Sequence, residues 1–183
     1  MGMARRLVLS VVVVLLALVA GRVVASAVFG PAAAGDPLEG RVERVVDGDT
    51  LRVDLPGDDR TVRVIGIDTH EVAHDGRPGA CYGDEARAYT QSLLDGRRVR
   101  LTLGREEQDR FGRTLATVRV LDGPSPGRDL SLALARGGYA RPLAIAPNTA
   151  NADEVARAVR EARRARRGLW ASCGSARAFP GKG

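Results

Sequence analysis

Residues 50–67 contain two apolar runs joined by a turn, and this pattern limits the possible fold more than any other part of the sequence. In the first run, Leu51, Val53 and Leu55 alternate with polar residues, which is the period of a strand with one buried face. The sequence PGDD at residues 56–59 is a turn signal, and a second apolar run follows at residues 60–67. The chain is therefore expected to begin its fold with short strands joined by tight turns.

Three further strands are expected at residues 40–46, 97–103 and 114–121, where apolar residues recur between turn signals. Aromatic residues make up only 4% of the chain, so the core between these strands must be largely aliphatic. Several short strands with turns of this type are typical of a small closed barrel.

Helical spacing appears in three places. One helix is expected over residues 84–96, a second over residues 129–136, closed by a pair of glycines, and a third from Asn151 to Gly168, with Glu154 in the position of a capping box. The residues expected to face the core are Ala86, Tyr89 and Leu93 in the first helix and Val155, Ala158, Val159 and Ala162 in the third. The element order predicts a mainly β fold with helices (α+β), a five-stranded barrel with three helices.

The first 27 residues have the three parts of a secretory signal peptide. Arg5 and Arg6 precede an apolar run at residues 7–20, and a small-residue site follows at Ala25 to Ala27. The run is shorter than the roughly 20 apolar residues that a membrane-spanning helix needs. We therefore expect export to a secreted or extracytoplasmic location, with residues 7–28 as a membrane anchor only if the segment is not cleaved.

The rest of the chain divides into three parts. Residues 28–37 are expected to be a linker, residues 38–173 a single domain of ordinary size, and residues 174–183 a tail. Cys81 and Cys173 lie in the domain, and in an exported protein they are candidates for a disulfide. The domain is expected to act as a monomer.

The formal net charge of +6 favours anionic partners, either nucleic acid or anionic lipid. Three of these charges are arginines within residues 1–27, a segment without acids, so the remainder of the chain carries +3. The arginines of the third expected helix are interpreted first as a solvated face and second as a phosphate-binding surface.

Acidic residues gather where two expected strands meet their turns. Asp47 and Asp49 flank a glycine before the strand at residues 50–55, and Asp68 and Glu71 follow the strand at residues 60–67. Carboxylates at strand ends lose hydration unless they are paired or bind a cation, and hard oxygen ligands suit calcium or magnesium. The alternative is that they are ordinary turn and loop acids.

Two arginines belong with these acids. Arg63 interrupts an apolar strand, and Arg113 follows a turn that enters another strand; the planar guanidinium matches a phosphate. Along an unbroken strand, Arg63 and Asp68 would point to opposite faces. A bend or bulge at Gly66, or release of the strand before Asp68, would reconcile them.

Several motifs resemble the staphylococcal nuclease (thermonuclease) family. They are VDGDTL at residues 46–51, VRVIGIDTHE at 62–71, YGDEA at 82–86, DRFGR at 109–113 and GLW at 168–170. The resemblance covers residues 38–173, and its specificity lies in the order of the motifs. It implies an OB-fold barrel with five strands and three helices, and a calcium-dependent nuclease that cleaves DNA and RNA to 3′-phosphate products.

The resemblance also implies roles for individual residues. Asp49 and Asp68 would bind Ca²⁺ through carboxylates and Thr69 through its backbone carbonyl, with Asp47 in support. Glu71 would be the general base for the attacking water. Arg63 and Arg113 would bind the scissile phosphate and neutralise its developing charge.

The sequence departs from the family pattern at the substrate-binding positions. His70 replaces a common proline beside Glu71, which would loosen this loop or bring an imidazole into the site. Ala144 and Ala146 stand near the positions of expected nucleotide-stacking tyrosines, and Phe111 replaces a tyrosine, keeping an aromatic face for substrate binding. Because stacking contributes about 1–3 kcal/mol per base, substrate binding is expected to be weaker or altered in base preference.

Two other functions remain open from the sequence. Residues 70–74, from His70 to His74, match the HExxH motif of zinc metallopeptidases, although the flanking sequences are loop signals rather than helix signals. The chain is alternatively a barrel that binds nucleic acid without cleaving it. The complete set of acids and arginines favours catalysis over both.

Overall fold

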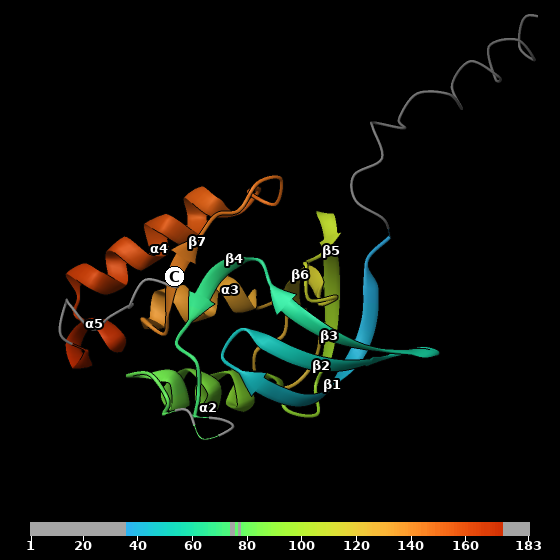
Figure 1. The fold of residues 1–183 in the computed structure, drawn as a ribbon, viewed down its shortest axis with the longest axis horizontal. Coiled ribbons are helices and arrows are strands. Elements are labelled where there is room, and N and C mark those ends of the chain that lie inside the picture. Colours follow the sequence, from blue (N-terminus) through green and yellow to red (C-terminus); the bar gives the residue numbers. More distant parts are fainter. Residues whose placement is uncertain (1–35, 74–75, 77, 174–183) are drawn as a thin grey trace, which may run out of the picture. The chain divides into compact units, whose positions relative to one another are not determined.

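The computed structural model describes residues 36–73, 76 and 78–173, all within the compact unit Ala34–Gly183. Five strands form a closed barrel in the order β1-β2-β3-β6-β5 (Figure 1). The strands are β1 (Leu38–Asp47), β2 (Thr50–Leu55), β3 (Asp58–Val64), β5 (Arg98–Gln108) and β6 (Thr114–Val120). This arrangement confirms the predicted α+β class and the five-stranded barrel.

Barrel closure depends on one parallel pairing and on antiparallel neighbours. β3 pairs in parallel with β6, with Val62 opposite Thr114, while β1 pairs with β5 to complete the ring. β5 runs to Gln108, five residues beyond the predicted end at residue 103. The pairing of β5 with β6 shifts register after Leu103, and the extension is mostly exposed, so it lacks the apolar alternation that sequence reasoning requires.

The predicted strand at residues 60–67 is two strands. β3 ends at Val64, and β4 (Gly66–Thr69) leaves the barrel to pair with β7 (Ala140–Leu143). Gly66 has φ of 90°, a left-handed conformation that glycine adopts without strain. The expected break at Gly66 is thus confirmed, and it turns Asp68 to the same side as Arg63. Sequence analysis missed β7, which has four residues and contains a proline.

The main helices are α2 (Gly83–Leu94), α3 (Leu130–Gly137) and α4 (Ala152–Arg164), followed by the short α5 (Leu169–Ser172), which was not predicted. Asp129 caps α3 by accepting a hydrogen bond from the Leu132 N–H at 3.1 Å, and Gly138 ends it in a left-handed conformation. All four residues predicted for the core face of α4 are buried.

The predicted capping box at Asn151 is wrong. Its side chain makes no cap hydrogen bond; the amide instead donates to Ser131 Oγ at 3.3 Å and to the Ile65 carbonyl at 3.5 Å. Asn151 therefore links the start of α4 to α3 and to the junction of β3 and β4. Tyr89 packs against the core, as predicted, although it is only half-buried, and it stacks on Tyr139 with ring centroids 4.3 Å apart.

The core is aliphatic, as the composition predicts. Leu51 and Val62 from the barrel and Leu134 from α3 are fully buried in one cluster with residues of α2 and α4. Full burial of such side chains stabilises the fold by about 1.5–3 kcal/mol each. The core fixes the barrel strands and helices together, and the strand ends that carry the acidic residues are positioned by it.

Cys81 and Cys173 are joined by a disulfide, with their Cα atoms 6.0 Å apart. The bond connects the segment before α2 to the end of α5 across 92 residues of sequence. The predicted signal peptide or anchor, most of the linker and the tail lie outside the described residues. No helix in the described part of the chain is long and apolar enough to cross a membrane.

Candidate active site

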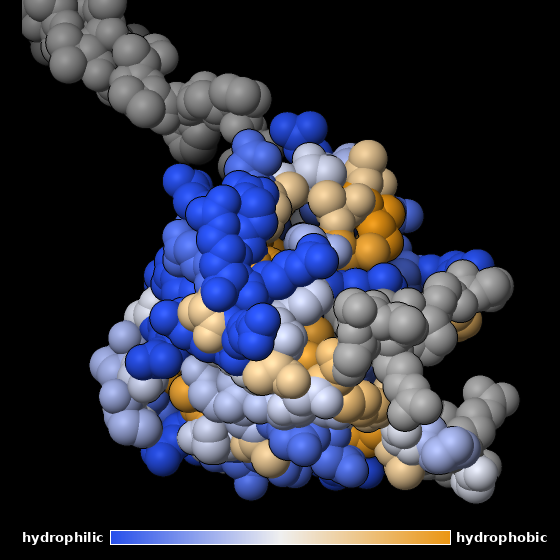
Figure 2. Space-filling view, turned by 90° about the vertical axis from the view of Figure 1, so that its left-hand side faces the viewer, coloured by the Kyte–Doolittle hydropathy of each residue, from blue (hydrophilic) through white to orange (hydrophobic). Residues whose placement is uncertain are grey.

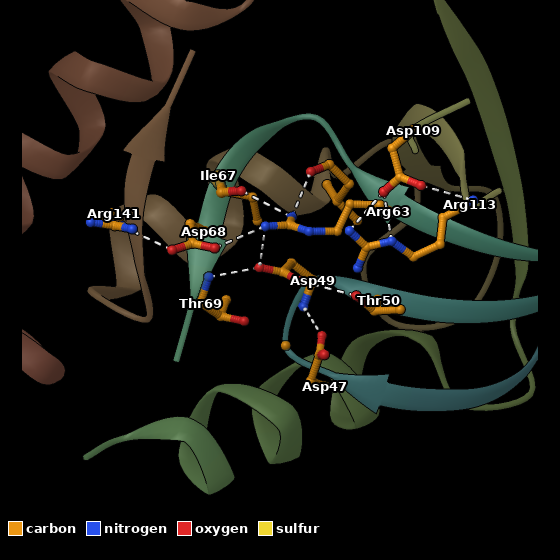
Figure 3. Close-up of polar contacts among 12 residues, drawn as sticks. Asp47, Asp49, Thr50, Arg63, Ile67, Asp68, Thr69, Asp109, Arg113 and Arg141 are labelled. Atoms are coloured by element: carbon orange, nitrogen blue, oxygen red, sulfur yellow. Dashed lines mark hydrogen bonds and ion pairs between the residues drawn. The ribbon is translucent and has the colours of Figure 1, made fainter. Parts of the chain in front are cut away.

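Asp49, Arg63 and Asp68 form a buried cluster beside the mouth of the barrel (Figure 3). One nitrogen of Arg63, Nη2, lies 3.1 Å from Asp49 Oδ2 and 3.0 Å from Asp68 Oδ1. The two aspartates are 4% and 2% exposed, respectively. The sequence predicted that Asp49 and Asp68 converge on a cation. In the structure both carboxylates contact the guanidinium of Arg63, a residue that the sequence assigned to the phosphate.

A tight turn between β1 and β2 positions Asp49. Asp47 Oδ1 accepts a hydrogen bond from the Asp49 N–H at 3.1 Å, which is the supporting position expected for Asp47. Gly48 lies so close to the neighbouring elements that a Cβ atom there would approach Thr69 to 2.8 Å and Ala86 to 2.9 Å. Thr90 of α2 donates to the Gly48 carbonyl at 2.8 Å. The turn thus depends on a glycine and on α2.

Arg63 is fixed by four acceptors. Besides the two carboxylates, its Nη1 donates to the carbonyls of Val64 and Ile67, each at 3.0 Å. These carbonyls flank the break between β3 and β4, so the guanidinium also stabilises the bend that turns Asp68 inward. Its charge offsets part of the cost of burying the carboxylates.

Burial raises the pKa of Asp49 to about 7, against the attraction of Arg63 and with a further increase from the nearby charge of Asp47. A carboxyl group with this environment ionises more readily when a cation approaches.

Arg141 belongs to the cluster but was not identified from the sequence. It lies opposite Asp68 in the β4–β7 pair, and its Nε donates to Asp68 Oδ2 at 2.9 Å. Both oxygens of Asp68 therefore have arginine partners. No local signal marks Arg141, because its position depends on pairing between strands more than 70 residues apart.

Oxygen atoms of Asp49, Asp68 and Thr69, which could act as metal ligands, lie near one another between β2 and β4. Thr69 donates its N–H to Asp49 Oδ2 at 2.7 Å, and its buried Oγ1 has no hydrogen-bond partner. Carboxylate, carbonyl and hydroxyl oxygens from these residues fit a hard cation such as Ca²⁺, which takes 6–8 oxygen ligands. Within the described residues no group of three or more acidic, histidine or cysteine side chains is arranged to hold a metal, so water or substrate oxygens would have to complete the coordination.

Glu71 follows β4 in an irregular segment and its side chain is exposed. The segment is held by its backbone: the Glu71 carbonyl accepts a hydrogen bond from Ala80 at 3.0 Å, and a Cβ on Gly83 would come within 2.4 Å of that carbonyl. His70 Nδ1 contacts the carbonyl oxygen of Cys81, so Nδ1 carries the proton. His70 is buried and fastens the segment rather than loosening it.

The HExxH motif does not form the helix that zinc metallopeptidases require. Residues 70–73 have no regular secondary structure, and His74 lies outside the described residues. The geometry therefore gives no support to the zinc alternative.

Arg113 and Phe111 form a second group around Asp109. Arg113 donates from Nε to Asp109 Oδ2 at 2.7 Å, and Asp109 Oδ1 accepts the backbone N–H groups of Phe111 and Arg113. Burial raises the pKa of Asp109, but these hydrogen bonds outweigh it and hold the pKa below its usual value. Arg113 enters β6 next to the position paired with β3, so the group lies beside Arg63 (Figure 3).

The two predicted arginines are thus neighbours with different partners: Arg63 contacts the aspartate pair, whereas Arg113 contacts Asp109. Phe111 is 67% exposed, and the guanidinium carbons of Arg110 and Arg113 lie 4.8 and 5.4 Å from its ring centre. Ala144 and Ala146 are exposed after β7 and offer no aromatic surface. Phe111 is therefore the aromatic side chain available to a nucleotide at this end of β6.

A closed five-stranded barrel whose strand ends gather carboxylates and arginines defines the class: an OB-fold domain equipped for phosphodiester hydrolysis. The chain belongs to the staphylococcal nuclease homologue family, whose sequence model matches residues 61–172. It is a nuclease, a hydrolase of the thermonuclease and endonuclease type.

Among its relatives are two staphylococcal thermonucleases. The chain is 35% identical to that of Staphylococcus hyicus over 133 residues, covering 72% of this chain and 75% of the relative. It is 37% identical to that of Staphylococcus intermedius over 129 residues, covering 70% and 74%. An SPbeta prophage-derived endonuclease of Bacillus subtilis is 31% identical over 138 residues, covering 73% of this chain and 44% of the relative.

Proposed function

We propose that this nuclease is exported and depends on calcium, and that it hydrolyses DNA and RNA to products ending in 3′-phosphate. The observation that carries the proposal is the buried pair Asp49 and Asp68, which share Arg63 and adjoin Thr69, whose N–H donates to Asp49 Oδ2. A divalent ion bound by these carboxylates would take the place of contacts that Arg63 makes with both of them and that Arg141 makes with Asp68.

Asp49, Asp68 and Thr69 would hold the ion. Bound Ca²⁺ supplies Lewis-acid polarisation of a phosphoryl oxygen and orients the scissile group. The exposed carboxylate of Glu71 takes a proton from the water whose oxygen forms the new bond to phosphorus. The bond from phosphorus to the 5′-oxygen breaks and this oxygen takes up a proton from solvent, which leaves a 3′-phosphate on one product and a 5′-hydroxyl on the other.

Arg63 and Arg113 bind the non-bridging phosphate oxygens, where negative charge increases in the transition state. Arg113 is half-buried and fixed by Asp109, so its guanidinium is oriented before substrate binds. Arg63 is held more rigidly, by two carbonyls and two carboxylates. Such fixed donors lower the reorganisation needed during reaction.

Export is supported by the composition of residues 1–27 and by the bond between Cys81 and Cys173. Disulfides persist mainly in oxidising compartments outside the cytoplasm. The test is fractionation of cells that express the full chain, with non-reducing mass spectrometry of the nuclease. The proposal requires activity outside the cytoplasm and a Cys81–Cys173 peptide; activity confined to the cytoplasm with two free thiols contradicts it.

Product chemistry is tested independently of location. Single-stranded DNA and RNA digested to completion should give fragments that a polymerase extends only after phosphatase treatment, because a 3′-phosphate blocks extension. Fragments that are extended directly carry 3′-hydroxyl ends and would contradict the proposed bond cleavage.

A further inference from the structure

A pocket of about 860 Å³ lies on the domain outside the cluster of Asp49, Arg63 and Asp68. It is lined by α3, by the loop between β6 and α3, by Tyr89 of α2 and by the segment after α4. Four arginines from separate segments line it, which we name the arginine pocket: Arg119, Arg128, Arg136 and Arg167. The fold, and not a run of basic sequence, concentrates these charges.

The positive charge of the arginine pocket is only partly neutralised. Arg119 and Arg167 donate to backbone carbonyls, those of Gly127 at 2.9 Å and of Arg136 at 3.2 Å, which orient the guanidinium groups without cancelling their charge. Of the two acids in the lining, Asp129 caps α3 and contributes its negative charge beside the four arginines. The other is Glu154, which pairs with Arg136 at 3.4 Å, and both side chains are more than half exposed.

The basic surface continues from Arg167 along the end of α4. Arg160, Arg163 and Arg164 are exposed, and the described structure records no ion pair for them. Figure 2 faces the side of the molecule that carries α4 and α5, and hydrophilic residues cover much of it. A chain of phosphates leaving the pocket would therefore meet further arginines.

Oriented, partly unpaired guanidinium groups are suited to phosphate oxygens, which they bind in a planar fork. Both nucleic acid and anionic lipid carry such oxygens. Membrane-binding surfaces place apolar side chains beside basic ones so that they enter the lipid. Phe111 and Ile145 are the large apolar side chains that are exposed in the described residues, and neither lines the pocket. The lining thus favours nucleic acid.

We propose that the arginine pocket binds phosphates of the nucleic-acid strand outside the segment being cleaved. The inference rests on the nuclease function and adds a second contact region for long substrates. Each phosphate contact releases bound counterions, so the contribution must be visible in the salt dependence of binding. A short substrate that fills only the catalytic site would not use the pocket.

The test compares Arg128→Ala combined with Arg167→Ala against a matched pair, Arg44→Ala combined with Arg52→Ala on the paired strands β1 and β2. The probe is a single-stranded phosphorothioate DNA of 30 nucleotides, which resists cleavage. Its binding is titrated at several NaCl concentrations between 50 and 200 mM. The loss of two phosphate contacts should make the negative slope of log association constant against log salt concentration shallower by about 1.4. It should also weaken binding about tenfold at 50 mM NaCl. The matched pair should change neither.

Arg128→Glu alone provides a second variant that does not depend on Arg167, which contacts the backbone of α3. Arg128 is exposed, and its charge reversal should reduce affinity for the long DNA at least as much as one lost contact. Unaltered slope and affinity in both pocket variants, with normal thermal unfolding, would overturn the proposal.

Two further arms separate this proposal from its rivals. The rate at which a thymidine dinucleotide is hydrolysed should be the same in the pocket variants and in the parent protein. If the parent hydrolyses neither this dinucleotide nor long DNA, the nuclease function itself is wrong. Binding of the uncleavable probe would still test the pocket in that case. Sedimentation with vesicles containing phosphatidylserine tests the lipid alternative. A loss of vesicle binding without a loss of DNA binding would contradict the nucleic-acid assignment.

Discussion

Arg63 is the residue on which both buried aspartates depend. Its Nη2 is shared between Asp49 and Asp68, while Arg141 binds the remaining oxygen of Asp68. Asp68 is nearly inaccessible to water and has two arginine partners, so the cluster should be destabilised by the loss of Asp68, Arg63 or Arg141. At the residue scale, the stability of the site and its chemistry therefore rest on the same contacts.

Asp68→Ala is expected to lower the free energy of unfolding by about 3–5 kcal/mol, because it removes the buried carboxylate that Arg63 and Arg141 both contact. Asp122→Ala is the matched control: its ion pair with Arg98, at 3.3 Å, is partly exposed, with side chains 34% and 56% accessible, and its loss should cost less than about 1 kcal/mol. Urea unfolding of both variants measures the difference. Equal losses would contradict the structural role assigned to Asp68.

Asp109 predicts a pH dependence on the acid side. Its pKa in the folded protein lies below the usual aspartate value of 3.8, so its contribution to stability is present above that pH and is lost as the pH falls through the lower folded value. Asp109→Asn should therefore reduce the loss of stability between pH 4 and pH 2. Urea titrations across this range check the sign; a steeper loss in the variant would contradict it.

The substrate-binding surface lacks aromatic side chains at positions 144 and 146, where a nucleotide base could stack. Because Ala146 is exposed near an expected tyrosine position, Ala146→Tyr should lower KM for single-stranded DNA by roughly 5-fold to 100-fold, the effect of about 1–3 kcal/mol. Phe111→Ala should raise KM by a similar factor. Steady-state kinetics on one oligonucleotide compares them, with Ala144→Ser as the control that adds no ring. No change in either direction would exclude both positions from the binding surface.

At the scale of elements, the site is assembled by the break between β3 and β4 and by the segment that joins β4 to α2. The break allows Asp68 to turn toward Arg63, and the segment carries His70 and Glu71 up to Cys81. The hydrogen bond from Ala80 to Glu71 and the contact of His70 with the Cys81 carbonyl hold the two ends of this segment together. The disulfide fastens one end of this loop to α5.

Replacement of Cys81 and Cys173 by alanine together should lower the free energy of unfolding by about 2–4 kcal/mol, because the bond closes a long loop in the unfolded chain. The Glu71 loop should also lose order, so kcat should fall while the protein remains folded at 20 °C. Urea unfolding and kinetics measure the two effects. Reductant should reproduce both in the parent protein and neither in the variant; a reductant effect on the variant would point to another cause.

Sequence reasoning located the elements whose signals are local. The alternation in β2, the turn before β3 and the buried face of α4 were all predicted from spacing. The pairing of β4 with β7 was missed, because four-residue strands with no alternation show their partner only in three dimensions. Arg141 was missed for the same reason, and Asn151 was misassigned because its amide found a tertiary partner.

At the scale of the whole molecule, one compact barrel presents two regions suited to phosphate. The first is the buried cluster of Asp49, Arg63 and Asp68 with Arg113 beside it; the second is the arginine pocket. The grouping of Asp49, Arg63 and Asp68 could be predicted from their motifs and from the expected break at Gly66. The pocket could not, since its arginines come from four separate segments.

The catalytic assignment is tested most directly by hydrolysis of DNA and RNA with 10 mM CaCl₂ or with excess chelator. The assay compares the parent with Glu71→Gln and with Glu43→Gln, an exposed acid of β1 that serves as the matched control. We predict calcium-dependent cleavage, a kcat lower by roughly 10²–10⁴ in Glu71→Gln, and an unchanged rate in Glu43→Gln. Cleavage that persists in chelator, or a Glu71→Gln variant as active as the parent, would contradict the proposed site and mechanism.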